Sequence, residues 1–199
     1  MYYNALDKRL KKLKTETKRI FSRYKAMIKF DEVNTLKLVK AMYKELDSLN
    51  KSAYLEIARD TYDMIYEGDK EDKSINKKWV NATLTDYDPV TKYVYENEVI
   101  RKQSRLFESL IASKNKFQDF ALAFNLWWRQ TSQYGITITD NAVVEAYKNM
   151  GYTHLVWNTQ KDTRVCEKCK ERDGKAYPID NLPSKAHYGC RCYWTGVKK

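Results

Sequence analysis

The N-terminal part of the chain carries apolar residues at alternating spacings of four and three. Lysines occupy many of the remaining positions of the first stretch. This spacing gathers the apolar side chains on one stripe of an α-helix, and we predict a helix over residues 4–30. Such a stripe can pack on a neighbouring helix of the same chain or on a second copy, and we favour the first arrangement. The stripe consists of Leu6, Leu10, Leu13, Thr17, Ile20, Tyr24 and Met27.

A second stretch with the same spacing follows after a short break. Asp31 and Asn34 are both suited to cap its N-terminus, because their short side chains can accept hydrogen bonds from free backbone N–H groups. We predict a helix that runs to about Tyr66 and stops at Gly68. The short connection between the first two helices indicates a long antiparallel helical hairpin over residues 1–67.

Two further helices are expected in the middle of the chain. Residues 68–74 are polar and are predicted to form a solvated connection, and Pro89 disfavours helix at the residue before it. The apolar positions then indicate helices over residues 90–112 and 116–133. Gly135 lies where a glycine C-cap of the second helix belongs.

The pattern changes near Gly151. Residues 136–139 alternate briefly between apolar and polar, and Asp140 is suited to cap a short helix that ends at Gly151. Strand-like residues, turn residues and cysteines follow. We therefore place a boundary there between a helical body, residues 1–150, and a C-terminal module, residues 151–199.

The composition favours a mainly α protein. With 199 residues, the chain can form one domain or a body with a small appended module. Hydrophobic residues make up 43% of the chain, which is enough for a core, whereas 6 Gly and 3 Pro are too few for the frequent turns of an all-β fold. The predicted fold is a long helical hairpin and helical body followed by a small β-rich knuckle.

The formal net charge of +11 is concentrated at the two ends of the chain. Residues 1–45 carry +8, residues 46–160 carry −2 and residues 161–199 carry +5. Basic ends attract polyanions, of which nucleic acid is the commonest, without implying sequence specificity. The candidate contacts to nucleic acid are Lys8, Arg9, Lys11 and Lys12.

Neither a membrane span nor a secretion signal is expected. No stretch approaches about 18 uninterrupted apolar residues, and the first residues hold no apolar run of signal-peptide length. We expect a protein of the cytoplasm without a membrane partner. In that reducing compartment, clustered cysteines are metal ligands more often than disulfides.

The sharpest chemical signal is a cluster of cysteines near the C-terminus. All four cysteines lie within the last 34 residues, together with one of only two histidines. A Cys-x-x-Cys pair is followed by a His-x-x-Cys pair with a similar bite, and two such pairs suit tetrahedral zinc. We predict one structural zinc ion per chain, with Cys166, Cys169, His187 and Cys190 as its ligands.

Cys192 is the alternative ligand. It is separated from Cys190 by one residue, so both side chains point to the same face of an extended chain, and both can reach the metal if one replaces His187. A site with four protein ligands leaves no position for water or substrate, which indicates a structural role. We find no enzyme signature, and His154 is expected to pack or cap rather than to catalyse.

Residues around the cluster have simpler expected roles. Trp157 and Trp194 are expected to cover the metal, because so small a module cannot build a core without it. Asp162 is expected to accept turn amides or to pair with Arg164. Four cationic side chains form either a solvated rim or a site for phosphate or an acidic partner; they are Lys168, Lys170, Arg172 and Arg191.

The spacing of these residues is recognisable as a whole. It is carried by Trp157, Asp162, Arg164, Cys166, Cys169, Asp173, Gly174, Leu182, Pro183, His187, Cys190, Arg191 and Cys192. The pattern resembles the C-terminal signature of the phage minor head proteins called Mu F-like, or head morphogenesis, proteins. The strong match covers roughly the last 45 residues, and the first 130 residues carry no motif that matches.

The resemblance implies a minor capsid component of a tailed bacteriophage, made in the cytoplasm of the infected cell. Similar proteins associate in few copies with the portal and the procapsid interior, and some influence DNA packaging or delivery. It therefore implies residence in the virion, at the capsid interior or portal vertex, with the portal or major capsid protein as partner. Non-specific contact with DNA and self-association through residues 4–30 are compatible with this role.

A second class of function is a zinc-dependent regulatory protein that binds nucleic acid. A nuclease of the HNH type is a weaker third, because that chemistry needs a histidine base and further metal-binding residues that the sequence does not offer. A binder driven by phosphate contacts should lose affinity steeply as salt rises, whereas a portal-binding protein should co-purify with procapsids at moderate salt.

Overall fold

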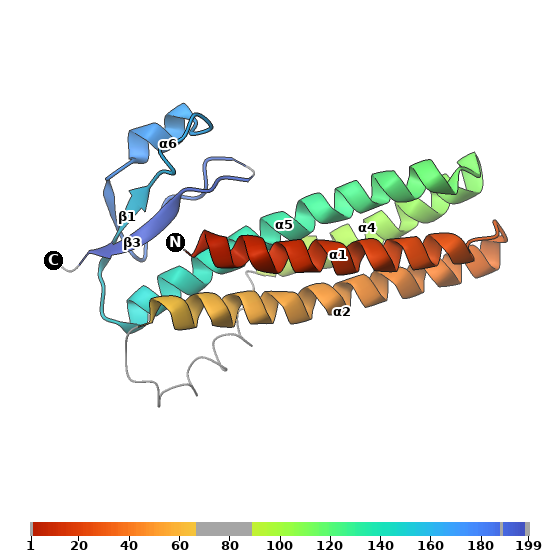
Figure 1. The fold of residues 1–199 in the computed structure, drawn as a ribbon, viewed down its shortest axis with the longest axis horizontal. Helices are drawn as coiled ribbons and strands as arrows, with labels where there is room; N and C mark the ends of the chain where they lie inside the picture. The colour runs from red at the N-terminus through yellow and green to blue at the C-terminus, as the bar shows by residue number, and fades with distance from the viewer. Residues whose placement is uncertain (1, 67–88, 188, 198–199) are drawn as a thin grey trace.

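Four long helices, one short helix and a small C-terminal sheet are the regular elements of the part of the chain that the computed structural model describes, residues 2–66, 89–187 and 189–197. The long helices lie side by side, and the C-terminal module sits at one end of them, near the N-terminus of the first helix (Figure 1). The opposite end is formed by the two short connections between the helices of each sequential pair. The predicted mainly helical fold with a small β-rich C-terminal part is confirmed.

The first two helices form the predicted hairpin. Helix α1 spans Tyr3–Met27 and helix α2 spans Glu32–Ile65. Asp31 is the N-cap of α2, and its carboxylate accepts a hydrogen bond from the backbone N–H of Asn34 at 2.7 Å. The predicted end at Gly68 and the connection over residues 68–74 lie outside the described residues.

The apolar stripe of α1 is buried within the chain. Leu6, Leu10, Leu13, Thr17 and Ile20 are buried against α2 and the fourth long helix, whereas Met27, at the last position of the stripe, is 46% exposed. The favoured packing against neighbouring helices of the same chain is therefore confirmed. Self-association through this helix stays a prediction.

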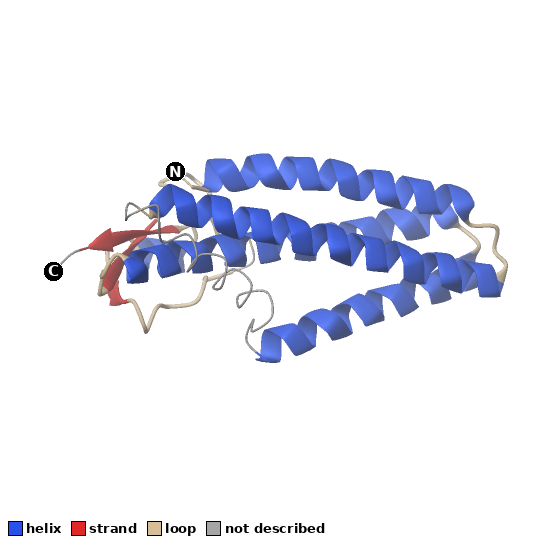
Figure 2. Cartoon of the chain, turned by 90° about the horizontal axis from the view of Figure 1, so that it is seen from below, coloured by secondary structure: helices blue, strands red, loops and turns tan. Residues whose placement is uncertain are grey.

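The second half of the helical body is a second antiparallel pair. Helix α4 spans Pro89–Ser113, and helix α5 spans Lys116–Asn149. Pro89 occupies the first turn of α4, where its missing N–H removes no helical hydrogen bond. Figure 2 shows that the N-terminal end of α4 diverges from the other long helices.

The predicted break at Gly135 is wrong, because α5 continues through it to Asn149. A Cβ at Gly135 would lie 3.1 Å from Leu10 Cδ2 and 3.5 Å from Leu6 Cδ1. The glycine therefore allows α1 and α5 to approach each other closely and does not end a helix. The expected short helix capped by Asp140 is part of the same continuous helix, and Asp140 is buried within it.

The C-terminal module contains a three-stranded antiparallel sheet and one short helix. Strand β1 spans His154–Asn158 and lies between β2, Ala176–Pro178, and β3, Tyr193–Val197. Helix α6 spans Glu167–Arg172 and lies in the connection between β1 and β2. Figure 1 shows this helix at the end of the module that lies farther from the long helices.

One hydrophobic cluster joins the module to the helical body. It contains Leu6 and Leu10 of α1 together with Leu155, Trp157 and Trp194 of the sheet. The backbone N–H of Trp194 donates a hydrogen bond to the hydroxyl of Tyr2 at 2.9 Å. The chain changes from long helices to strands after α5, as expected. The division into two folding units at residue 150 stays a prediction.

No helix among the described residues combines the length and the apolar character that are needed to cross a membrane.

Candidate metal centre

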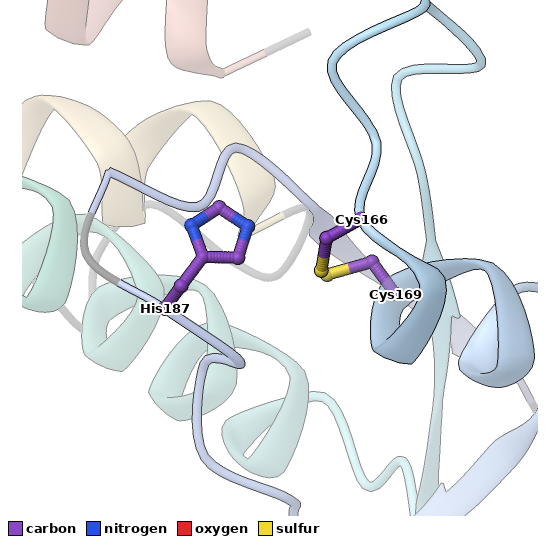
Figure 3. Close-up of side chains that lie close together, drawn as sticks. All are labelled: Cys166, Cys169 and His187. Atoms are coloured by element: carbon purple, nitrogen blue, oxygen red, sulfur yellow. The ribbon is translucent and has the colours of Figure 1, made fainter.

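Helix α6 positions the first pair of candidate ligands. Cys166 is the N-cap residue of α6, and Cys169 lies in its first turn. The carbonyl of Cys166 accepts hydrogen bonds from the N–H groups of Cys169 and Lys170, both at 3.0 Å, which fixes the turn between the cysteines. Figure 3 shows both sulfurs on the side of α6 that faces the loop carrying His187. The first turn of α6 therefore holds the side chains of Cys166 and Cys169 close together.

The second group of candidate ligands comes from the segment before β3. The N–H of Cys190 donates to the carbonyl of His187 at 3.3 Å, which closes a tight turn. Gly189 within this turn has a φ of 70°, a value that glycine adopts without strain. Its N–H donates to the side-chain carbonyl of Gln133 on α5 at 2.8 Å, so the helical body helps to position this loop.

The structure brings all five candidate side chains together around Cys169. The ligand atoms of Cys166, Cys169 and His187 lie within 4.8 Å of one another, and so do those of Cys169, Cys190 and Cys192. Cys169 belongs to both groups, although it is separated by more than twenty residues from Cys192 in the sequence. The predicted residues are therefore clustered, and the choice of the fourth ligand, with Cys192 as the alternative to Cys190 or to His187, stays open.

The sulfur spacing suits a shared metal ion and not a disulfide. Cys169 Sγ and Cys190 Sγ are 3.6 Å apart, and all four cysteines are free. Two sulfurs bound to one tetrahedral zinc ion at about 2.3 Å each are separated by about 3.8 Å, whereas a disulfide requires about 2.05 Å. The donor set therefore fits zinc, and this geometry carries the assignment of a candidate metal centre.

Burial changes the pKa values of the cysteine thiols. Cys169, Cys190 and Cys192 are buried, Cys166 is half-buried and His187 is exposed. Burial raises the pKa of Cys169, and neighbouring thiols raise it further; burial also raises the pKa of Cys192 to about 11. A hydrogen bond from the backbone N–H of Cys169 lowers the pKa of Cys166. A divalent cation would favour the thiolate form that burial disfavours.

Comparison with protein families gives a match over this part of the chain. The family described as "Phage Mu protein F like protein" matches residues 125–195, which extend from the first third of α5 to β3. Residues 125–195, a little over a third of the chain, are therefore similar to the phage Mu protein F-like family. The match includes every residue of the signature and both groups of candidate ligands. No curated protein and no solved structure shows significant similarity to the chain.

The phage Mu protein F-like segment includes most of α5, residues 125–149, as well as the strands of the module up to residue 195. The resemblance expected from the signature alone is therefore confirmed and extends further toward the N-terminus than the cysteines indicate. The family indicates a protein of phage head morphogenesis, which acts with other capsid proteins and resides in the virion. Helices α1, α2 and α4 lie before the matched residues.

Aromatic side chains of the phage Mu protein F-like segment pack beside the cysteine cluster. Trp157 and Trp194 are buried, with their rings edge to face and their centroids 4.9 Å apart. They belong to the same hydrophobic cluster as Cys169, Cys190 and Cys192. The guanidinium of Arg172 lies 5.2 Å from the centre of the Trp157 ring. The aromatic cover expected from the sequence is therefore present beside the candidate ligands.

Asp162 holds the loop before α6. Its carboxylate accepts a hydrogen bond from the backbone N–H of Arg164 at 3.0 Å and also pairs with the guanidinium of Arg191. The expected turn role of Asp162 is confirmed, and its link to Arg191 ties this loop to the segment between Cys190 and Cys192. His154 lies on β1, where its Nδ1 is 3.0 Å from the hydroxyl of Thr153.

Sequence reasoning missed a buried polar cluster, which we name the Asp140 cluster: Tyr3, Asp140, Lys185 and the carbonyl of Cys192. Tyr3 donates to Asp140 Oδ1 at 2.8 Å, and Lys185 Nζ lies 3.1 Å from Asp140 Oδ2 and 3.1 Å from the Tyr3 hydroxyl. Lys185 also donates to the carbonyl of Cys192. The cluster joins α1, α5 and the module. Its members are far apart in the chain, so no local sequence motif predicts that they meet.

The candidate nucleic-acid contacts lie on α1. Lys8, Lys11 and Lys12 are exposed, whereas Arg9 pairs with Glu56 at 2.7 Å and with Asp60 of α2. Two carboxylates thus offset the charge of Arg9, and its role in the structure is to join the first two helices. Lys8, Lys11 and Lys12 remain as candidates for an electrostatic contact.

Proposed function

We propose that this protein is a minor head protein of a tailed bacteriophage that associates with the portal or with the interior of the procapsid. The family match over residues 125–195 carries the proposal, because it places the clustered cysteines in a family of phage head morphogenesis. The proposed partners are the portal protein, the major capsid protein or both. The proposed location is the capsid interior or the portal vertex, after assembly in the host cytoplasm.

Mass spectrometry of purified virions before and after genome release tests this role. The expected result is a few copies per particle before release. A decrease after release would identify a protein that leaves with the DNA, and an unchanged amount would identify a resident of the capsid. Absence from both virions and procapsids would contradict the proposed role.

The C-terminal module is proposed to bind one structural zinc ion per chain. The proposed ligands are Cys166, Cys169, His187 and Cys190, with Cys192 as the alternative ligand. A bound zinc ion would link α6 to the loop before β3 and offset the negative charge of the thiolates. Four protein ligands leave no open coordination position, so we propose a protein without enzymatic activity.

Elemental analysis and Co²⁺ substitution test the metal centre. One zinc per chain is expected, and the visible spectrum of the Co²⁺ form distinguishes three sulfurs and one nitrogen from four sulfurs. Replacing His187 with Ala should change that spectrum, whereas the control His154→Ala should not. Protein that contains no metal after purification without chelators, and that takes up none, would exclude the site.

Non-specific contact with DNA is proposed for the exposed lysines of α1. Replacing Lys8, Lys11 and Lys12 with Gln should weaken binding of duplex DNA and reduce the dependence of binding on salt, with a change of slope of up to about one unit for each phosphate that is no longer neutralised. The matched control replaces the exposed residues of α2, Lys37, Lys40 and Lys44. Equal DNA binding by the two variants would refute this contact.

The alternative function is a zinc-dependent regulatory protein that binds nucleic acid. This alternative predicts a sequence preference among duplexes, which non-specific phosphate contacts do not produce. Competition between unrelated duplexes of equal length separates the two functions. Equal competition supports the minor head protein, and a preference of at least about a hundredfold supports the regulator.

A further inference from the structure

We propose that the furrow between α4 and α5 binds an amphipathic segment of a partner protein, in which acidic side chains flank apolar ones. This inference rests on the proposed function, because it identifies the surface and the kind of partner through which the protein joins other head proteins. The furrow lies on the helical body, and neither the candidate metal centre nor the lysines of α1 line it.

The furrow consists of two adjoining hollows. The larger has a volume of about 470 Å³, and the smaller has a volume of about 190 Å³. Lys102, Arg105 and Leu126 line both hollows, so the two form one continuous depression along the helices. The larger volume lies in the range of protein pockets that hold ligands.

The rim of the larger hollow is cationic. Arg101, Lys102, Arg105 and Arg129 line it, and Glu98 supplies the only carboxylate that the described part of the chain places there, so the described lining residues have a net charge of +3. Glu98 is already shared between Arg101 and Lys102. Four cations and one carboxylate leave the described lining positively charged, and this charge favours an anionic group. Guanidinium groups are suited to bind carboxylates through paired hydrogen bonds.

The floor of the furrow is apolar. Leu126 lies in both hollows, and Leu106 and Leu122 line the smaller one. The side chain of Leu122 is a large hydrophobic group that is 50% exposed. A phosphodiester chain has no apolar group that would cover these leucines, whereas an amphipathic peptide segment covers them and presents its acidic residues to the rim. The combination favours a protein segment over nucleic acid.

A buried hydroxyl gives a second sign of a missing partner. Tyr43 lines the smaller hollow, is only 1% exposed, and its hydroxyl has no hydrogen-bond partner within residues 2–66, 89–187 and 189–197. A buried hydroxyl without a partner destabilises a protein by about 1–3 kcal/mol. The nearby carboxylate of Asp119 accepts hydrogen bonds from Ser109 and Ser113, both at 2.5 Å. A polar group of the bound segment would provide the acceptor that Tyr43 lacks.

The test measures binding of the full chain to the purified portal protein, to purified procapsids of the same phage and to duplex DNA. One furrow variant combines Arg101→Glu with Arg105→Glu, and its control combines Lys40→Glu with Lys44→Glu on α2. Both pairs change the net charge by the same amount. A second variant, Leu122→Glu, removes an exposed apolar group from the floor, and its control is Val33→Glu, because Val33 is 81% exposed and lies outside the furrow.

Both furrow variants are expected to bind the portal protein or the procapsid at least about tenfold more weakly than the unaltered chain, whereas both controls change binding by less than about twofold. Thermal unfolding shows that each variant is folded, and Leu122→Glu is informative even if the arginine variant is destabilised. Unchanged binding of both furrow variants would overturn this inference and leave the proposed function intact. Loss of DNA binding without loss of protein binding would overturn it in favour of a nucleic-acid site. If the unaltered chain binds neither the portal protein nor procapsids, the proposed function fails as well.

Discussion

Replacing Asp140 with Ala should strongly destabilise the folded protein, because it leaves the ammonium of Lys185 in a site from which water is largely excluded. The side chains of Asp140 and Lys185 are only 11% and 16% exposed, and their charged atoms are 3.1 Å apart. Breaking such a buried pair by removing one partner costs about 3–5 kcal/mol. For a chain of this length, that loss corresponds to a decrease in Tm of about 6–20 °C.

A double-mutant cycle separates the ion pair from general loss of packing. Lys185→Met removes the other charge, and the double variant leaves no unpaired charge, so it should be more stable than the sum of the single effects predicts. The expected coupling is about 2 kcal/mol. Urea unfolding, followed by circular dichroism for the helices and by tryptophan fluorescence for the module, provides the measurement. Strictly additive effects, or a loss below about 1 kcal/mol for Asp140→Ala, would refute the reasoning.

The protonation of Asp140 should also make the stability of the protein depend on pH. Burial raises the pKa of Asp140 to about 6, although Lys185 and the hydrogen bond from Tyr3 act in the opposite direction. An unfolded Asp has a pKa of about 3.9, so between about pH 4 and 6 the folded state retains a proton that the unfolded state has lost. This contribution to the free energy of unfolding therefore decreases as pH rises through that window, by up to about 3 kcal/mol. Relative to Asp140→Asn, the unaltered protein should show this decrease, and parallel pH profiles would contradict it.

Three further predictions concern single positions. Gly196→Ala should destabilise the module by about 1–3 kcal/mol, because a Cβ there would lie 2.6 Å from ring atoms of Tyr147 and Tyr152; a change in Tm of less than about 1 °C would refute this. Gly135→Leu should separate α1 from α5 and lower the midpoint of urea unfolding, whereas the exposed control Leu122→Ala should change it little. Cys169→Ser should abolish zinc binding and loosen the module while most of the helical circular dichroism remains, and retention of one zinc per chain would contradict the central place of Cys169.

The helical body could be predicted where a pattern was local. Spacings of three and four residues identified α1, α2 and the start of α5, and Asp31 was one of two expected caps for α2. Gly135 was misread because a glycine that ends a helix and a glycine that admits a neighbouring helix look the same in the sequence. The difference lies in Leu6 and Leu10, more than one hundred residues away. Asp140 was assigned to a cap for the same reason, since its partners Tyr3 and Lys185 are distant in the chain.

The candidate metal centre was more predictable than the surfaces around it. Its residues occur in two short segments whose spacing reflects the bite of a metal ion, and the fold then brings the two segments together. The furrow between α4 and α5 had no such signal. Arg101, Arg105 and Arg129 look like ordinary surface cations until the packing of the two helices places them around one hollow.

The hydrogen bond between Tyr2 and Trp194 has a mechanical consequence. It joins the start of α1 to β3, so a force applied to the two ends of the described chain acts first on the contacts of Tyr2 and Tyr3 with the module. The long helices between those points are shielded from tension until these contacts break.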